Sequence, residues 1–172
     1  ISYFIIITQW ISLPTGSKLY NWICTIGNLC YSICYQSISI ILTLVFILYI
    51  LIGGCTGIIL GNVLIDISLH DSYYIVTHFH FILSLGTGLT IILSTLLLQD
   101  HILHYHIITT TSILSRYYFM TVNIGFILTF ISMHYLGFNC MPRRIFDSPD
   151  SNNSWNYISS IGSGITLISF FI

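Results

Sequence analysis

The sequence predicts an all-α bundle of helices that cross a lipid membrane, and three observations support this fold class. Hydrophobic residues make up 55 % of the 172 residues, and the mean hydropathy is +0.91. Charged residues make up only 5 %, whereas a soluble domain carries about 25 % and needs them for a hydrated surface. Several apolar segments reach the roughly 20 residues that a spanning helix needs. Soluble, disordered and nucleic-acid-binding classes are therefore excluded, the last because the net charge is -1.

The expected elements follow from the apolar segments in chain order. Residues 1–13 are apolar and indicate the end of one span. Three complete spans are expected over residues 38–62, 73–99 and 112–138. Residues 157–172 indicate the beginning of a further span. We therefore predict a single membrane domain over residues 1–172, with three full spans and two partial or short ones.

Counting spans assigns the polar segments to two membrane faces. We define face P as the face that holds His70 and Asp71, and face M as the opposite face. The chain crosses twice between Asp71 and the basic pair Arg143 and Arg144, so this pair also lies on face P. The same counting places Lys18 toward face M. Basic residues on both faces leave the absolute orientation open.

Two histidines lie inside the second complete span. Ionisable groups at membrane depth are costly, so His78 and His80 are functional candidates. At about 100° per residue, positions i and i+2 point about 200° apart, so the two rings serve different partners more easily than one ion. Neutral imidazole is a common axial ligand of haem iron, so one helix between two haems is one interpretation of this spacing. The alternative is two histidines that hydrogen-bond neighbouring helices or face a water-filled cavity.

The polar residues of face P are further candidates. His70 and Asp71 could bind a hard divalent ion, or Asp71 could simply stabilise the start of a helix. Arg143 and Arg144 could pair with carboxylates such as haem propionates, or extend to lipid headgroups. His134, near the end of the third complete span, could reach this cluster, and its role stays open.

Other polar residues lie toward face M. Thr15 and Lys18 are three residues apart and share a helix face, so they could line a proton path; a membrane-interface anchor at Lys18 is the alternative. His101, His104 and His106 have the composition of a metal-binding tract. About 30 Å of hydrocarbon separates them from face P, and we interpret them as solvated loop histidines.

The segment from residue 70 to residue 81, HDSYYIVTHFHF, closely resembles the signature of subunit I in the haem-copper oxidase family, as found in mitochondrial cytochrome c oxidases. Further segments resemble the family in the same order, at residues 13–22, 53–57, 64–69 and 136–144. The resemblance implies that the chain corresponds to the C-terminal portion of a twelve-helix subunit, from about the eighth helix to the twelfth.

The resemblance implies a role for each matched residue. His78 would be an axial ligand of the high-spin haem at which oxygen is reduced, and His80 an axial ligand of the low-spin haem. The other implied roles are magnesium ligands (His70 and Asp71), haem propionate contacts (Arg143, Arg144 and Asp66) and part of the K-type proton path (Lys18 and Thr15). Copper ligands are not expected in this chain.

The implied activity is that of a terminal respiratory oxidase, which reduces oxygen to water with electrons from cytochrome c and pumps protons. The implied cofactors are two haems A and magnesium, with copper bound by another polypeptide or segment. The implied partners are the N-terminal part of subunit I, subunits II and III, cytochrome c and the lipid of the mitochondrial inner membrane. The alternatives are a quinol oxidase of the same family and, from another class, a haem-free transporter or structural membrane subunit.

Overall fold

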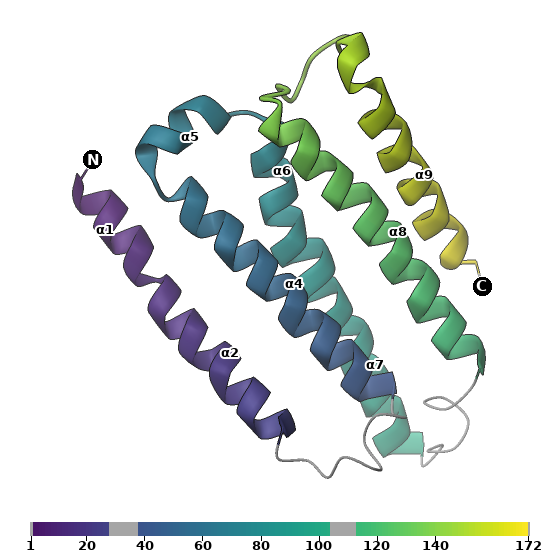
Figure 1. Cartoon of the computed structure of the whole chain (residues 1–172). Coiled ribbons are helices and arrows are strands. Elements are labelled where there is room, and N and C mark those ends of the chain that lie inside the picture. Colours follow the sequence, from purple (N-terminus) through teal and green to yellow (C-terminus); the bar gives the residue numbers. More distant parts are fainter. Residues whose placement is uncertain (1, 28–37, 104–112, 172) are drawn as a thin grey trace.

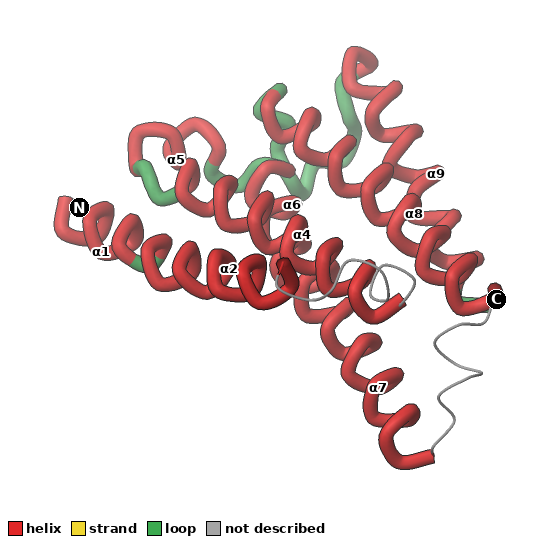
Figure 2. Tube along the Cα trace, turned by 60° about the horizontal axis from the view of Figure 1, so that its bottom comes forward, coloured by secondary structure: helices red, strands yellow, loops and turns green. Residues whose placement is uncertain are grey.

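The computed structural model describes residues 2–27, 38–103 and 113–171, and helices dominate these segments (Figure 1). In chain order the α-helices are α1 (Ser2–Trp10), α2 (Ser12–Gly27), α4 (Ile38–Leu60), α5 (Val63–Leu69), α6 (Tyr73–His80), α7 (Gly88–Leu103), α8 (Ile113–Phe138) and α9 (Asn153–Ser169). A π-helical segment, η1 (Phe81–Thr87), joins α6 to α7, and a 3₁₀ turn, η2 (Asp150–Asn152), precedes α9. The described segments contain no β-strand, and Figure 2 shows the long helices side by side. The predicted all-α fold is confirmed.

Three helical segments are long and apolar enough to cross a membrane: Ile38–Leu60, Tyr73–Thr95 and Ser115–Phe138. They agree with the three complete spans predicted from the sequence. The helices at the two ends of the chain are shorter. The first span was expected to end at residue 13, but helical structure continues through α2 to Gly27. Pro14 does not stop it, because it lies in the first turn of α2, where a missing backbone N–H removes no helical hydrogen bond.

The two ends of the bundle have different structures. In Figure 1, α5 and the segment between α8 and α9 lie together at the upper end, and the C-terminal ends of α2 and α7 lie at the lower end. The upper end therefore contains His70, Asp71, Arg143 and Arg144, which agrees with the assignment of all four to face P.

A backbone connection joins α6 and α8 at face P. Ser72 and Pro142 form an isolated antiparallel bridge, and the Tyr73 amide donates to the Met141 carbonyl at 3.0 Å. At Gly137 of α8, a Cβ atom would overlap the backbone of Tyr74 at the start of α6. The absence of a side chain at Gly137 therefore lets the two helices meet at the level of the histidine-bearing segment.

Helix α6 and its continuation η1 also pack against α4. A Cβ on Gly53 would lie 2.8 Å from Cγ1 of Ile82, so the backbone of α4 approaches η1 closely at this point. About one turn before Gly53 in α4, the hydroxyl of the buried Tyr49 is 2.9 Å from Oδ1 of Asn123 on α8. These contacts hold the segment with His78 and His80 between α4 and α8.

Candidate functional site

His78 lies on the side of α6 that faces α4. Its Nδ1 atom is 3.0 Å from the hydroxyl oxygen of Thr56, which is itself 2.9 Å from the Gly53 carbonyl oxygen. A hydroxyl has one hydrogen, and this one is donated to the carbonyl, so the Thr56 oxygen accepts from His78. The hydrogen of the neutral ring is therefore on Nδ1, and Nε2 keeps a free lone pair.

His80 lies on the opposite side of α6, toward α8. Its Nδ1 atom is 2.7 Å from the Val76 carbonyl oxygen, which can only accept, so Nδ1 again carries the hydrogen. The ring stacks on Phe130 of α8, with 5.2 Å between ring centroids and an interplanar angle of 23°. The two histidines thus face different neighbours, as their i, i+2 spacing predicts.

Both rings have the chemistry that an axial haem ligand requires. Among the described residues, neither Nε2 atom has a hydrogen-bond partner, and each Nδ1 is held by an oxygen. A metal-binding histidine typically donates its other N–H to such an acceptor, which fixes the tautomer and the ring orientation. At Gly57, a Cβ atom would lie 2.8 Å from Cε1 of His78, so the glycine makes space for this ring. The residues present therefore fit a haem on each side of α6.

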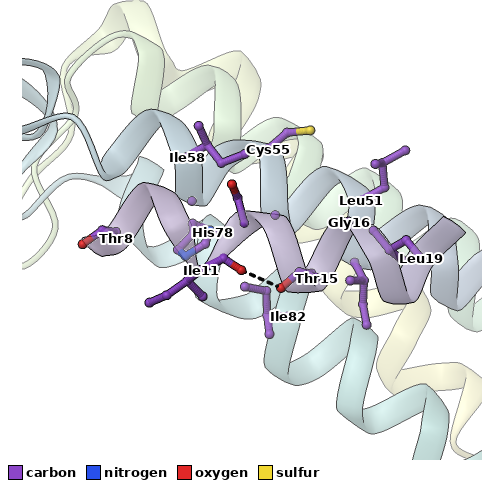
Figure 3. A pocket seen from close by; sticks show the side chains of 14 residues that line it. Thr8, Ile11, Thr15, Gly16, Leu19, Leu51, Cys55, Ile58, His78 and Ile82 are labelled. Carbon is purple, nitrogen blue, oxygen red and sulfur yellow. Dashed lines mark hydrogen bonds between the residues drawn. The ribbon is translucent and has the colours of Figure 1, made fainter. Parts of the chain in front are cut away.

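A pocket of about 470 Å³ lies beside His78, between the α1–α2 pair, α4 and the α6–η1 segment (Figure 3). Most of its wall is apolar, but α1 and α2 contribute the hydroxyls of Thr8, Ser12 and Thr15. Lys18 is exposed and does not line the pocket. The structure thus brings Thr15, but not the Lys18 side chain, to the cavity that contains His78.

At face P, the structure joins two residues to which the resemblance gives different roles. Nε of Arg143 is 2.5 Å from Oδ1 of Asp71, and the Arg143 amide donates to the Asp71 carbonyl at 2.8 Å. His70 and Arg144 are exposed, and Asp66 is partly exposed on α5. Within the described segments, no three His, Cys, Asp or Glu side chains gather as a metal site. A metal ion held by His70 and Asp71 would therefore need further ligands, such as water.

The remaining histidines have separate positions. His101 belongs to α7 and not to a loop, so the expectation of a loop is wrong for this residue. His104 and His106 lie outside the described residues, and their interpretation remains a prediction. His134 packs edge-on against Tyr74, with 5.5 Å between ring centroids. Nε2 of His134 and the Tyr74 hydroxyl are buried without a partner in the described part of the chain.

Sequence reasoning did not identify Thr56 as a functional candidate. Its hydroxyl reaches His78 from another helix, so the spacing within α6 could not indicate it. The sequence does contain one signal. Thr56 lies inside a span, and Gly53, three residues before it, and Gly57, one residue after it, are on the same side of the helix. Small residues of this kind allow a neighbouring helix to approach closely.

Comparison with known proteins gives one consistent family. Residues 1–165 match the sequence model described as cytochrome c and quinol oxidase polypeptide I. Cytochrome c oxidase subunit 1 of Plasmodium falciparum is 43 % identical over 171 residues, covering 99 % of this chain and 35 % of that protein. The same subunit of Theileria parva is 38 % identical, covering 96 % of this chain and 34 % of that protein. The subunit of Yarrowia lipolytica is 37 % identical, with 99 % and 31 % covered. The chain thus spans about a third of the length of these relatives.

Proposed function

Because this chain belongs to the cytochrome c and quinol oxidase polypeptide I family, we propose that it forms part of the catalytic subunit of a terminal respiratory oxidase. The complex would reduce oxygen to water with electrons from cytochrome c and pump protons across the mitochondrial inner membrane. Since the chain spans about a third of its relatives' length, the rest of the subunit I fold would come from an N-terminal part, which would work with subunits II and III.

The proposal is carried by the two imidazoles that leave α6 in opposite directions. His78 would bind the high-spin haem A through Nε2, and His80 the low-spin haem A on the other side. When bound, the haems supply electron transfer and the site of oxygen reduction. The chain holds each ring in one orientation, His78 through Thr56 and His80 through the Val76 carbonyl.

The polar end of the bundle would hold the charged groups of the cofactors. Arg143 and Arg144 would contact the haem propionates, because guanidinium groups pair well with carboxylates. Asp66 on α5 would contact a propionate only through a shared proton or a water molecule. Asp71 uses Oδ1 in its ion pair with Arg143, so Oδ2 is left for magnesium together with His70 and water. The copper ligands would come from the N-terminal part of the subunit.

Thr15 and Lys18 would form part of the K-type proton path. Thr15 lines the pocket that contains His78, and Lys18 lies one helical turn farther toward the end of α2. The ammonium group would take protons from face M, and the row of hydroxyls on α1 and α2 would lead them toward the His78 pocket.

The alternatives are less well supported. The family description includes quinol oxidases, but the relatives compared above are named cytochrome c oxidase subunit 1, which favours cytochrome c as the electron donor. A haem-free transporter or structural subunit would give no reason for two histidines that both leave Nε2 free inside a span.

The test is the haem content of the purified complex. We expect His78→Ala and His80→Ala each to remove one of the two haems, because each variant deletes the ring whose Nε2 would bind the haem on its side of α6. The measurement is the visible spectrum with haem quantified per complex, and the two variants should lose different spectral components.

His134→Ala is the matched control, since it also removes a histidine ring from a membrane-spanning helix. This variant should keep both haems. Full haem content in the double variant His78→Ala/His80→Ala would show that the ligand assignment is wrong, and so would an equal loss of haem in all three single variants.

A further inference from the structure

Three residues of α4 form a cradle for the His78 ring. Gly53, Thr56 and Gly57 lie on one helix face, at positions i, i+3 and i+4. The Thr56 hydroxyl is buried, with the residue 8 % exposed, and lies 3.0 Å from Nδ1 of His78. Gly57 leaves the space that Cε1 of the ring approaches, and Gly53 supplies the carbonyl that accepts the Thr56 hydrogen. One side of the ring is thus in contact with groups from another helix.

The environment of His80 differs in a specific way. Its Nδ1 donates to the Val76 carbonyl in its own helix, at 2.7 Å. His78 donates to a hydroxyl on α4, at the longer distance of 3.0 Å, with the Gly53 backbone as a second nearby partner. The Nδ1 atom of His80 is therefore held within its own helix, whereas that of His78 is held by groups on another helix.

We propose that Thr56 is a positioning residue for His78, whose hydroxyl fixes the tautomer and rotation of the ring and sets the strength of the bond that Nε2 can form. The inference rests on the proposed function, since it concerns His78 as the ligand of the high-spin haem. It assigns Thr56 no contact with substrate or haem. A carbonyl from the same helix holds His80, whereas the orientation of His78 depends on the contact between α4 and α6.

The experiment compares Thr56→Val with Thr56→Ser in the assembled oxidase. Valine has nearly the shape of threonine without the hydroxyl, and serine keeps the hydroxyl. We expect Thr56→Val to lower and broaden the iron–histidine stretching band of the reduced high-spin haem in resonance Raman spectra, because Nδ1 loses its acceptor. Thr56→Ser should keep the band at the wild-type position.

Thr90→Val is the matched control, because the Thr90 hydroxyl also donates to a helix carbonyl, that of Gly86, but contacts no histidine. It should leave the band unchanged. An unchanged band in Thr56→Val would overturn the proposal. A shift to higher frequency would also overturn it, because it would identify the Gly53 carbonyl as the partner that controls the ring.

The proposed function and this inference fail in different ways. If His78 is not the ligand, His78→Ala keeps the high-spin haem and neither Thr56 variant changes the band. If His78 is the ligand but Thr56 does not position it, His78→Ala loses the haem while Thr56→Val retains both the haem and the wild-type band. Haem content measured on the same samples separates these results from simple loss of folding.

Discussion

His78, His80 and His134 lie in the described membrane-spanning helices, and each places Nδ1 beside an oxygen atom. These oxygens belong to different groups. Each histidine has its Nδ1 atom within 3.2 Å of an oxygen. For His80 and His134 this oxygen is the carbonyl four residues earlier in the same helix. His78 instead uses Thr56 of a neighbouring helix. At the scale of single residues, each of these rings thus has an oxygen beside one nitrogen, which leaves the other nitrogen without such a contact.

Lys18 provides the residue-scale prediction. Lys18→Met keeps most of the length of the side chain but removes the ammonium group of the one lysine in the sequence. If Lys18 carries protons toward the oxygen-reducing site, this variant should slow reduction of the high-spin haem by on the order of 100-fold, the size typical for loss of a proton-transferring group. Stopped-flow absorbance of the complex measures this rate.

Thr25→Val is the control for Lys18→Met. Thr25 lies on α2 and is exposed, but it does not line the His78 pocket, so its replacement should leave the rate unchanged. Both variants should keep both haems. A wild-type rate in Lys18→Met would remove Lys18 from the proton path.

The sequence predicts part of the residue-scale picture. The opposite directions of His78 and His80 follow from helical geometry within one segment, and the structure agrees. The partner of His78 could not be predicted, because periodicity says nothing about how α4 is aligned against α6. The ion pair between Asp71 and Arg143 could not be predicted either. The two residues are 72 positions apart in the sequence, and the turn after α8 brings Arg143 to Asp71.

At the scale of elements, α8 and α9 pack through glycines that oppose one another. A Cβ on Gly162 of α9 would lie 2.6 Å from the Thr129 nitrogen and 2.8 Å from the Gly125 carbonyl oxygen. A Cβ on Gly125 would lie 2.9 Å from the Gly162 carbonyl oxygen. Because the obstacles are backbone atoms, no side-chain movement can relieve an added methyl group, so both glycines are required for this helix contact.

Gly162→Ala therefore should destabilise the packing of α9 on α8. We expect a loss of about 1–3 kcal/mol, typical of overpacking at a close contact. Gly164→Ala in the same helix meets nothing within 4 Å, so it should be neutral or stabilising by up to about 1 kcal/mol through helix propensity. Thermal unfolding of the solubilised complex measures both. Equal effects of the two variants would show that the contact at Gly162 does not limit stability.

The elements themselves were predicted to different degrees. The three complete spans follow from length and apolar character, and their positions agree with the structure. Helix α5 was not predicted, because its seven residues are too few for a periodic signal and begin with a local hydrogen bond from the Leu64 amide to Asn62. The π-helical segment η1, directly after His80, also lay beyond sequence reasoning, since residue spacing does not distinguish it from a regular helix.

At the scale of the whole molecule, the polar candidates divide between the ends of one bundle. His70, Asp71, Arg143 and Arg144 lie at the end that contains α5 and the α8–α9 connection, and α2 ends at the other (Figure 1). Counting spans predicts this division, because each complete span reverses the side of the membrane. His78 and His80 lie on the helix that runs between these ends, where the proposed proton path from one face and the proposed propionate contacts at the other would meet.

This arrangement predicts which positions share a membrane face. In a variant whose native cysteines are replaced by serine, Ser68→Cys on α5 and Ser151→Cys in η2 should react with a membrane-impermeant maleimide from the same side, because both are exposed at the face P end. Thr25→Cys, near the end of α2, should react only from the opposite side. Labelling of intact and opened membrane vesicles, read by mass spectrometry, measures this. Reaction of Ser68→Cys and Ser151→Cys from different sides would contradict the even number of crossings between α5 and α9, and with it the proposed common location of the magnesium and propionate contacts.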